Sequence, residues 1–222
     1  MIPWTVLGTA PIPGGEGELR LARRGAEFSI SLSGRGELMN SRVHSSEDAL
    51  AELAVAELHA PSPRVLVGGL GMGFTLAAAL RVLPPGASVT VAELVPAVVD
   101  WNEGALGECA GWPVRDPRAV VRVADVADVI AGSAGAFDAV LLDVDNGPEG
   151  LTHRDNDRLY SRAGLAAARR ALRPGGVLAV WSAHPSPAFT SRLRSVGFDV
   201  RAVDTRARQG RGSRHVIWLA RT

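Results

Sequence analysis

Cysteine is almost absent from this chain of 222 residues, which contains only Cys109. One cysteine excludes an intramolecular disulfide and a cysteine-based zinc cluster, and we expect no metal site. Cys109 has no basic neighbour in the sequence that would activate its thiol, so it is a poor candidate nucleophile. The sequence therefore favours a small, partly buried cysteine without a chemical role.

An excess of charge of one sign is also missing. The 24 basic side chains nearly balance the 23 acidic ones, so no overall field attracts nucleic acid or an anionic membrane, and we expect neither partner. The chain lacks an uninterrupted apolar run of about eighteen residues that could span a bilayer. It also lacks the basic segment and apolar stretch of a signal peptide. These absences predict a cytoplasmic, globular enzyme.

Internal repeats and low-complexity tracts are absent as well, but the first part of the chain differs from the rest. Residues 1 to 43 alternate apolar and polar side chains in two segments, 18–23 and 28–32. This alternation predicts a small antiparallel β-hairpin or three-stranded sheet. A helix is expected over 49–59, because Ser45 and two acids precede apolar residues at helical spacing.

Beyond residue 61 the chain alternates strand and helix patterns. Strands are expected at 65–68, 88–93, 119–123, 137–143, 176–182, 198–204 and 214–220, and helices at 73–83, 95–107, 126–132, 157–172 and 186–195. Strands separated by helices predict a parallel, doubly wound sheet, and the short last connection predicts an antiparallel last strand. We expect an N-terminal β extension with a lid helix over 1–60 and a Rossmann-like, seven-stranded α/β domain over 61–222.

The most informative stretch combines a buried strand, a glycine turn, a helix and a second strand that ends in a carboxylate. Gly69, Gly71 and Gly73 follow the apolar run 65–68, and Glu93 lies about twenty residues beyond the turn. Glycines let the turn press its backbone against a ligand, and an acid at this distance can hold two ribose hydroxyls. This order favours a nucleoside-bearing cofactor over a purely structural turn.

Further polar residues follow neighbouring strand ends, where parallel sheets bind ligands. Asp125 could accept a hydrogen bond from an adenine amino group or simply cap the next helix. Asp143, with Asp145 close behind, ends a buried strand and could orient or deprotonate a nucleophile. His44, just before the first predicted helix, is equally well explained as a base or substrate contact and as a structural residue.

Together these pieces resemble the spermidine synthase (polyamine aminopropyltransferase) family within the S-adenosylmethionine (SAM) dependent methyltransferase superfamily. The resembling segments are 69–73, Glu93, Asp125, 137–143 with Gly147-Pro148, and 172–178. The resemblance implies a class I methyltransferase fold, a dimer formed through β-strands, and SAM bound by Gly69, Gly71, Met72, Gly73, Glu93, Leu94, Asp125, Val126 and Asp143. It further implies that Glu93 holds the ribose, that Asp125 binds the adenine and that Asp143 acts as general base on an amine.

The acceptor side decides which reaction we expect. In the aminopropyltransferases an aspartate of the glycine turn holds the amine of decarboxylated SAM, whereas this chain has Met72 there. Asn146 stands where that family has a second catalytic aspartate, with Asp145 shifted by one. Because a thioether cannot balance an ammonium, the sequence favours methyl transfer from intact SAM to a small, amine-bearing acceptor, with Asp143, Asp145 and His44 as candidate catalytic residues. Aminopropyl transfer from decarboxylated SAM to a diamine is the alternative, and a noncatalytic nucleoside-binding module is a second one.

An arginine cluster surrounds the last predicted hairpin. Its members are Arg201, Arg206, Arg208, Arg211 and Arg214. These side chains could clamp a carboxylate, a phosphate or an RNA backbone. A solvated loop is the favoured interpretation, because the net charge of the chain is close to zero.

Overall fold

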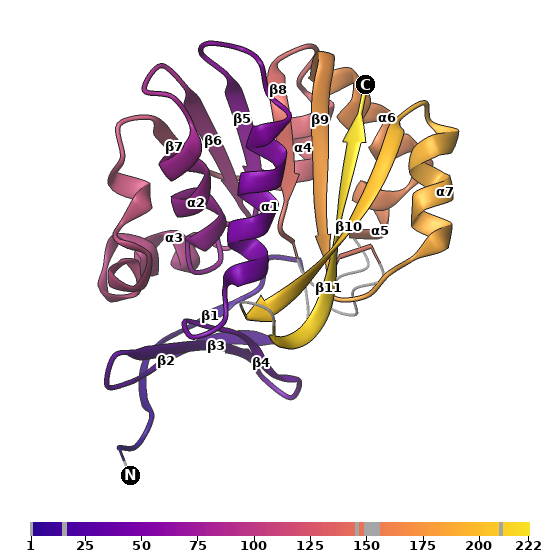
Figure 1. The fold of residues 1–222 in the computed structure, drawn as a ribbon. Coiled ribbons are helices and arrows are strands. Elements are labelled where there is room, and N and C mark those ends of the chain that lie inside the picture. The colour runs from indigo at the N-terminus through magenta and orange to yellow at the C-terminus, as the bar shows by residue number, and fades with distance from the viewer. Residues whose placement is uncertain (1, 15–16, 145–146, 149–155, 209–210) are drawn as a thin grey trace.

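The computed structural model describes residues 2–14, 17–144, 147–148, 156–208 and 211–222. These residues form an α/β fold with a small four-stranded sheet and a large seven-stranded sheet. Figure 1 shows the small sheet lying beneath the large one, with helix α1 (Ser45–Ala56) running from the small sheet up along the large sheet.

The small sheet is antiparallel and its strands follow one another in chain order. It comprises β1 (Thr5–Pro11), β2 (Glu18–Arg24), β3 (Glu27–Leu32) and β4 (Gly36–Asn40). In β2 the predicted alternation places Leu19 and Leu21 in the core and leaves Glu18 and Arg20 exposed. The prediction of a hairpin or three strands falls short of the four observed strands, because β1 and β4 lie outside the two segments whose alternation was recognised.

The large sheet carries the predicted topology. Its strands are β5 (Arg64–Gly68), β6 (Ser88–Glu93), β7 (Ala119–Val123), β8 (Phe137–Leu142), β9 (Leu172–Ser182), β10 (Asp199–Arg208) and β11 (Arg211–Arg221), in the order β10-β11-β9-β8-β5-β6-β7. Pairing is parallel between β9 and β8, β8 and β5, β5 and β6, and β6 and β7. The last strand, β11, is antiparallel to both β9 and β10. The mostly parallel sheet with a reversed last strand is therefore confirmed.

The remaining helices begin and end close to the predicted bounds. They are α2 (Phe74–Val82), α3 (Pro96–Glu103), α4 (Val126–Ala131), α5 (Asn156–Tyr160), α6 (Arg162–Ala171) and α7 (Pro187–Ser195), with 3₁₀ turns at Ala105–Ala110 and Pro113–Arg115. The helix expected over 157–172 is divided in two, because the hydroxyl of Ser161 caps α6 by accepting from the Gly164 backbone N at 3.1 Å. None of the described helices has the length and apolar character needed to cross a bilayer.

Two apolar layers cover the two faces of the large sheet. In β5, Val65 and Val67 pack into the layer beneath α1 and α2, and Leu66 packs into the layer beneath α4, α6 and α7. The first layer continues into the small sheet through residues such as Phe28 and Ile30. Because helices occupy both faces, the carboxyl ends of the parallel strands are the places left for a ligand, and they point toward the small sheet (Figure 1).

The turn after β5 requires glycine. Gly69 has a φ of +87°, and a Cβ at this position would collide with the backbone carbonyl of Asp143.

We expect Gly69→Ala to lower the free energy of unfolding by about 2–4 kcal/mol in urea denaturation, because it adds this collision to an unfavourable backbone conformation. Gly175→Ala is the matched control: its φ is +76°, but no atom lies within 4 Å of the added Cβ. It should cost only about 1–2 kcal/mol, and equal losses in the two variants would contradict this account.

Candidate active site

Two adjoining cavities lie between the carboxyl ends of the parallel strands and the small sheet. The larger has a volume of about 220 Å³ and the smaller a volume of about 130 Å³. Leu38 and Met39 of β4, Gly71 of the glycine turn and Asp143 line both cavities. A molecule bound in one cavity would therefore meet a molecule bound in the other beside the Asp143 carboxylate.

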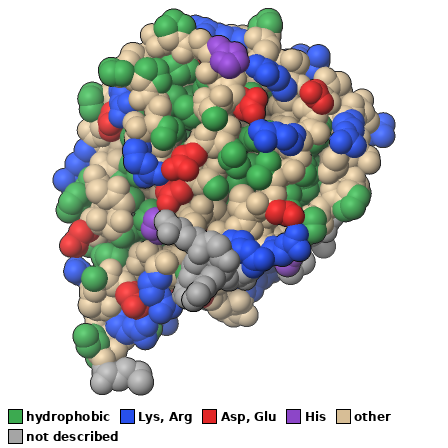
Figure 2. All heavy atoms as spheres, viewed as in Figure 1, with side chains coloured by type: hydrophobic (Ala, Val, Ile, Leu, Met, Phe, Trp, Pro, Cys, Tyr) green, Lys and Arg blue, Asp and Glu red, His purple; other side chains and the backbone are tan. Residues whose placement is uncertain are grey.

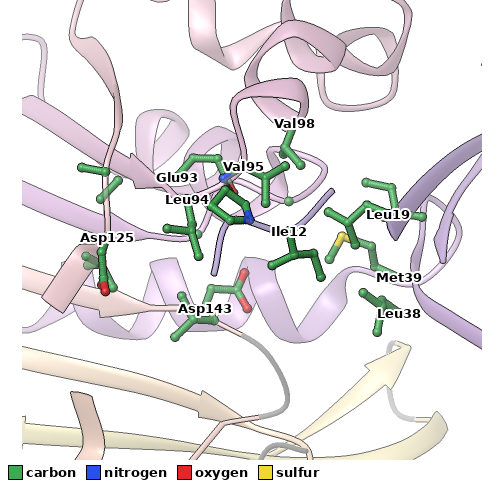
Figure 3. A pocket seen from close by; sticks show the side chains of 18 of the residues that line it. Ile12, Leu19, Leu38, Met39, Glu93, Leu94, Val95, Val98, Asp125 and Asp143 are labelled. Carbon is green, nitrogen blue, oxygen red and sulfur yellow. Dashed lines mark hydrogen bonds between the residues drawn. The ribbon is translucent and has the colours of Figure 1, made fainter. Parts of the chain in front are cut away.

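The larger cavity brings together most of the residues that the sequence assigned to the cofactor. Gly69, Gly71, Glu93, Leu94, Asp125, Val126 and Asp143 all line it, opposite apolar side chains of the small sheet. Figure 3 shows the Asp143 carboxylate pointing into this cavity, between Asp125 on one side and Leu38 and Met39 on the other. Met72 lines the smaller cavity instead, and Gly73 adopts a left-handed conformation as the residue that caps α2.

Glu93 ties the glycine turn to the turn after β6. Its side chain is buried, and its two carboxylate oxygens accept hydrogen bonds from the backbone N atoms of Leu70 and Val95, each at 2.8 Å. Burial raises the pKa of Glu93, and the backbone donors oppose that rise. These donors lie in the turns after β5 and β6 and include Gly71 and Leu94 as well as Leu70 and Val95. Glu93 also borders the larger cavity, where its carboxylate is available to the hydroxyl groups of a ligand.

Asn102 of α3 supports the glycine turn from behind. Its side chain is fully buried, and its Nδ2 donates to the carbonyl oxygens of Gly71 at 2.9 Å and Val98 at 2.8 Å. Nothing in the sequence distinguishes this residue. It lies in a predicted helix close to Asp100 and Glu103, and an asparagine in such a segment is usually exposed.

Asp125 shows the structural role that the sequence left open. It is the residue that caps α4, and its Oδ1 accepts from the Ala127 backbone N at 2.7 Å. Its Oδ2 accepts from the Arg158 guanidinium at 3.0 Å. Asp125 also borders the larger cavity, so helix capping does not remove it from the candidate site.

Asp143 is a buried acid with a raised pKa at the border of both cavities. It follows β8, and its Oδ2 accepts a hydrogen bond of 2.5 Å from the hydroxyl of Thr75 in the first turn of α2. Burial, together with repulsion from the Glu47 carboxylate, raises the pKa of Asp143 from 3.8 to about 7, and the Thr75 donor opposes this rise. An acid with this pKa can accept a proton near neutral pH.

Glu47 is the second acid that lines the smaller cavity, and its position there is not apparent from the sequence. It lies in the first turn of α1 and lines the smaller cavity with Asp143, Phe74 and Trp181. Its Oε2 accepts from the Ser46 hydroxyl at 2.7 Å, and burial raises the pKa of Glu47. In the sequence this residue looks like an ordinary first-turn acid that favours the helix dipole, so no local signal separates it from a surface glutamate.

His44, another candidate catalytic residue, lies outside both cavities and is absent from the described residues that line them. Its ring stacks on Phe74 with the centroids 4.2 Å apart, and its Nδ1 lies 2.9 Å from Oδ2 of Asp48. Asp145 lies outside the residues that the structure describes.

Two arginines near the last hairpin form local ion pairs. Arg201 contacts Glu57 and Arg214 contacts Asp204, each at 2.7 Å. Figure 2 shows basic and acidic side chains interspersed over this face of the molecule. The observed pairs therefore fit the favoured interpretation, in which these side chains are solvated at the surface.

Comparisons with known proteins find similarity to polyamine aminopropyltransferases and spermidine synthases. No protein-family model matches the chain. The chain is similar to the polyamine aminopropyltransferases of Mycobacterium tuberculosis and Mycobacterium bovis, with 31% identity over 198 residues that cover 82% of this chain and 35% of each relative. The chain thus spans about a third of the length of the curated relatives that it matches.

Solved structures share the fold. A spermidine synthase in complex with the transition state analogue AdoDATO matches with a TM-score of 0.75 and 17% identity, over 97% of this chain and 72% of that one. The spermidine synthase of Thermotoga maritima has the same coverage and identity with a TM-score of 0.76. A probable spermidine synthase of Corynebacterium glutamicum gives 0.69 and 19%, over 98% of this chain and 80% of that one.

These relatives overturn the expectation of methyl transfer from intact SAM. The curated relatives are aminopropyltransferases, and the neighbouring structures are spermidine synthases. The prediction was wrong because it looked for the carboxylate that balances an ammonium within the glycine turn, where Met72 stands. The fold supplies a second carboxylate from another element, since Glu47 of α1 lines the same cavity as Met72.

The raised pKa of Asp143 predicts a pH-dependent effect on stability. Because the native state holds a proton on Asp143 that the unfolded chain releases, stability falls as pH rises from 3.8 through about 7. Asp143→Asn removes this loss, and we expect it to raise the free energy of unfolding of the ligand-free protein by about 1–3 kcal/mol at about pH 8.5, with little gain at about pH 4.5. Urea denaturation at both pH values measures the effect. Asp100→Asn, at an exposed site of α3, is the control, and an equal gain in the two variants at high pH would contradict the assignment.

Proposed function

We propose that this chain, which is spermidine synthase-like and has the class I methyltransferase-like fold, transfers an aminopropyl group from decarboxylated SAM to an amine acceptor. The observation that carries the proposal is the position of Asp143. Its carboxylate borders both cavities, and its pKa is raised to about 7. The Asp143 carboxylate thus lies where a nucleoside-bearing donor in the larger cavity and a small acceptor in the smaller cavity would meet.

The larger cavity suits the nucleoside part of the donor. Glu93 would accept hydrogen bonds from the two ribose hydroxyls, and apolar residues such as Leu94 and Val126 would pack against the adenine. Glycine at position 71 keeps the turn open, because a Cβ there would lie 3.2 Å from the Met39 sulfur. Asp125 would accept from the adenine amino group while it continues to cap α4.

The smaller cavity suits the acceptor and the transfer itself. The lone pair of the acceptor nitrogen attacks the propyl carbon that is bonded to the sulfonium sulfur. The carbon–sulfur bond breaks, its electron pair stays on sulfur, and methylthioadenosine leaves as a neutral thioether. The attacking nitrogen must lose a proton, and Asp143 would accept it. The protein also contributes alignment of the two substrates and exclusion of water.

A direct assay tests this function. The purified protein is incubated with decarboxylated SAM and 1,4-diaminobutane, and mass spectrometry follows methylthioadenosine and the aminopropylated amine. We expect Asp143→Asn to lower kcat/KM by about 10²- to 10⁴-fold, because it removes the proton acceptor but keeps the shape of the side chain.

Glu52→Gln is the control for this assay. Glu52 lies on α1 outside the lining of both cavities and pairs with Arg81 at 2.8 Å, so the variant should keep wild-type activity. Failure of the wild-type protein to release methylthioadenosine with any diamine or triamine would overturn the proposed function.

A further inference from the structure

Two acids border the smaller cavity. Glu47 enters it from α1 and Asp143 enters it from the end of β8, and none of the described residues that line it is Lys, Arg or His. Asp48 repels Glu47 further, and His44 contacts Asp48 at 2.9 Å. Arg81 pairs with Asp48 at 3.8 Å and with Glu52 at 2.8 Å.

Two carboxylates held in this way destabilise each other. Burial and repulsion from Asp48 raise the pKa of Glu47, and burial and repulsion from Glu47 raise the pKa of Asp143. Folding does not gain from such a pair, because buried like charges need a cation or a proton to balance them. The pair therefore points to a cationic group that enters the cavity with a substrate.

The remaining walls of the cavity fit an alkylammonium. Phe74 and Trp181 contribute aromatic side chains, and Leu38, Met39 and Met72 contribute apolar ones. Aromatic faces attract ammonium groups and also pack against methylene chains. A cavity of about 130 Å³ accommodates one short aliphatic chain and not a nucleoside.

We propose that Glu47 binds a primary ammonium group of a substrate in the smaller cavity, beside Asp143, and thereby selects substrates that carry a positive charge there. This inference rests on the proposed transfer reaction, because that reaction brings the amines into the cavity. Two sources offer the same chemistry: the aminopropyl end of decarboxylated SAM and an amine of the acceptor. Glu47 holds the charged amine, and Asp143 remains available for the proton of the attacking nitrogen.

Titration calorimetry on the ligand-free protein tests the role of Glu47. Three ligands are compared: methylthioadenosine, which lacks the aminopropyl group, decarboxylated SAM, and 1,4-diaminobutane added to protein saturated with methylthioadenosine. Glu47→Gln keeps the shape of the side chain and still accepts from Ser46, so its loss of affinity reports the charge. We expect a loss of about tenfold or more for one of the two amines, with unchanged binding of methylthioadenosine.

The pattern of loss identifies the source of the ammonium. A loss confined to decarboxylated SAM assigns Glu47 to the donor amine, and a loss confined to 1,4-diaminobutane assigns it to the acceptor. Glu47→Asp, which retains the charge, should lose less than Glu47→Gln, and Glu52→Gln should lose nothing. The melting temperature of ligand-free Glu47→Gln at about pH 8 should equal or exceed that of the wild type, because one buried charge is gone.

Three results would overturn the inference: wild-type affinity of Glu47→Gln for both amines, an equal loss in Glu47→Asp, or a loss that extends to methylthioadenosine. The transfer assay separates this outcome from the proposed function. Undiminished transfer by Glu47→Gln would remove the role of Glu47 and leave the transferase intact. Loss of amine binding in Glu47→Gln, together with no transfer by the wild type, would keep the role of Glu47 in amine binding and overturn the proposed transfer reaction.

Discussion

The position of Asp143 depends on a close backbone approach between two neighbouring parallel strands. The Asp143 backbone N donates to the Gly68 carbonyl at 3.0 Å, and the residue after Gly68 lies so near the Asp143 carbonyl that only glycine fits. The same turn leads into α2, whose Thr75 holds the Asp143 carboxylate. The glycine turn thus borders both cavities and also fixes the position of the Asp143 carboxylate between them.

The small sheet and α1 turn an open sheet edge into an enclosed site. Leu38 and Met39 of β4 form a wall that both cavities share, and Glu47 of α1 contributes the second carboxylate. Enclosure removes water from both acids, and this burial is the first cause of the raised pKa of Glu47 and of Asp143. The N-terminal part of the chain therefore contributes to the charge of the smaller cavity as well as to its shape.

The comparisons and the site complement each other. The curated relatives are aminopropyltransferases, and Met72 of this chain stands where the resemblance to that family led us to expect an acidic residue. Under the proposed function, the carboxylate of Glu47 on α1, which lines the same cavity as Met72, would supply the negative charge instead. An ammonium needs a nearby negative charge, but that charge can come from any element that borders the cavity.

Local pattern in the sequence was sufficient to predict the large sheet, its reversed last strand, and the grouping of Glu93, Asp125 and Asp143 at one edge. Parallel strands separated by helices can only align their carboxyl ends, so residues at strand ends must converge. Tertiary structure alone decided the partners of these residues. Glu47, Thr75 and Asn102 come from helices whose sequences look ordinary, and they meet the site only after the helices pack against the sheet. The pKa of Asp143 and the charge of the smaller cavity depend on those long-range contacts, and no spacing rule along the chain encodes them.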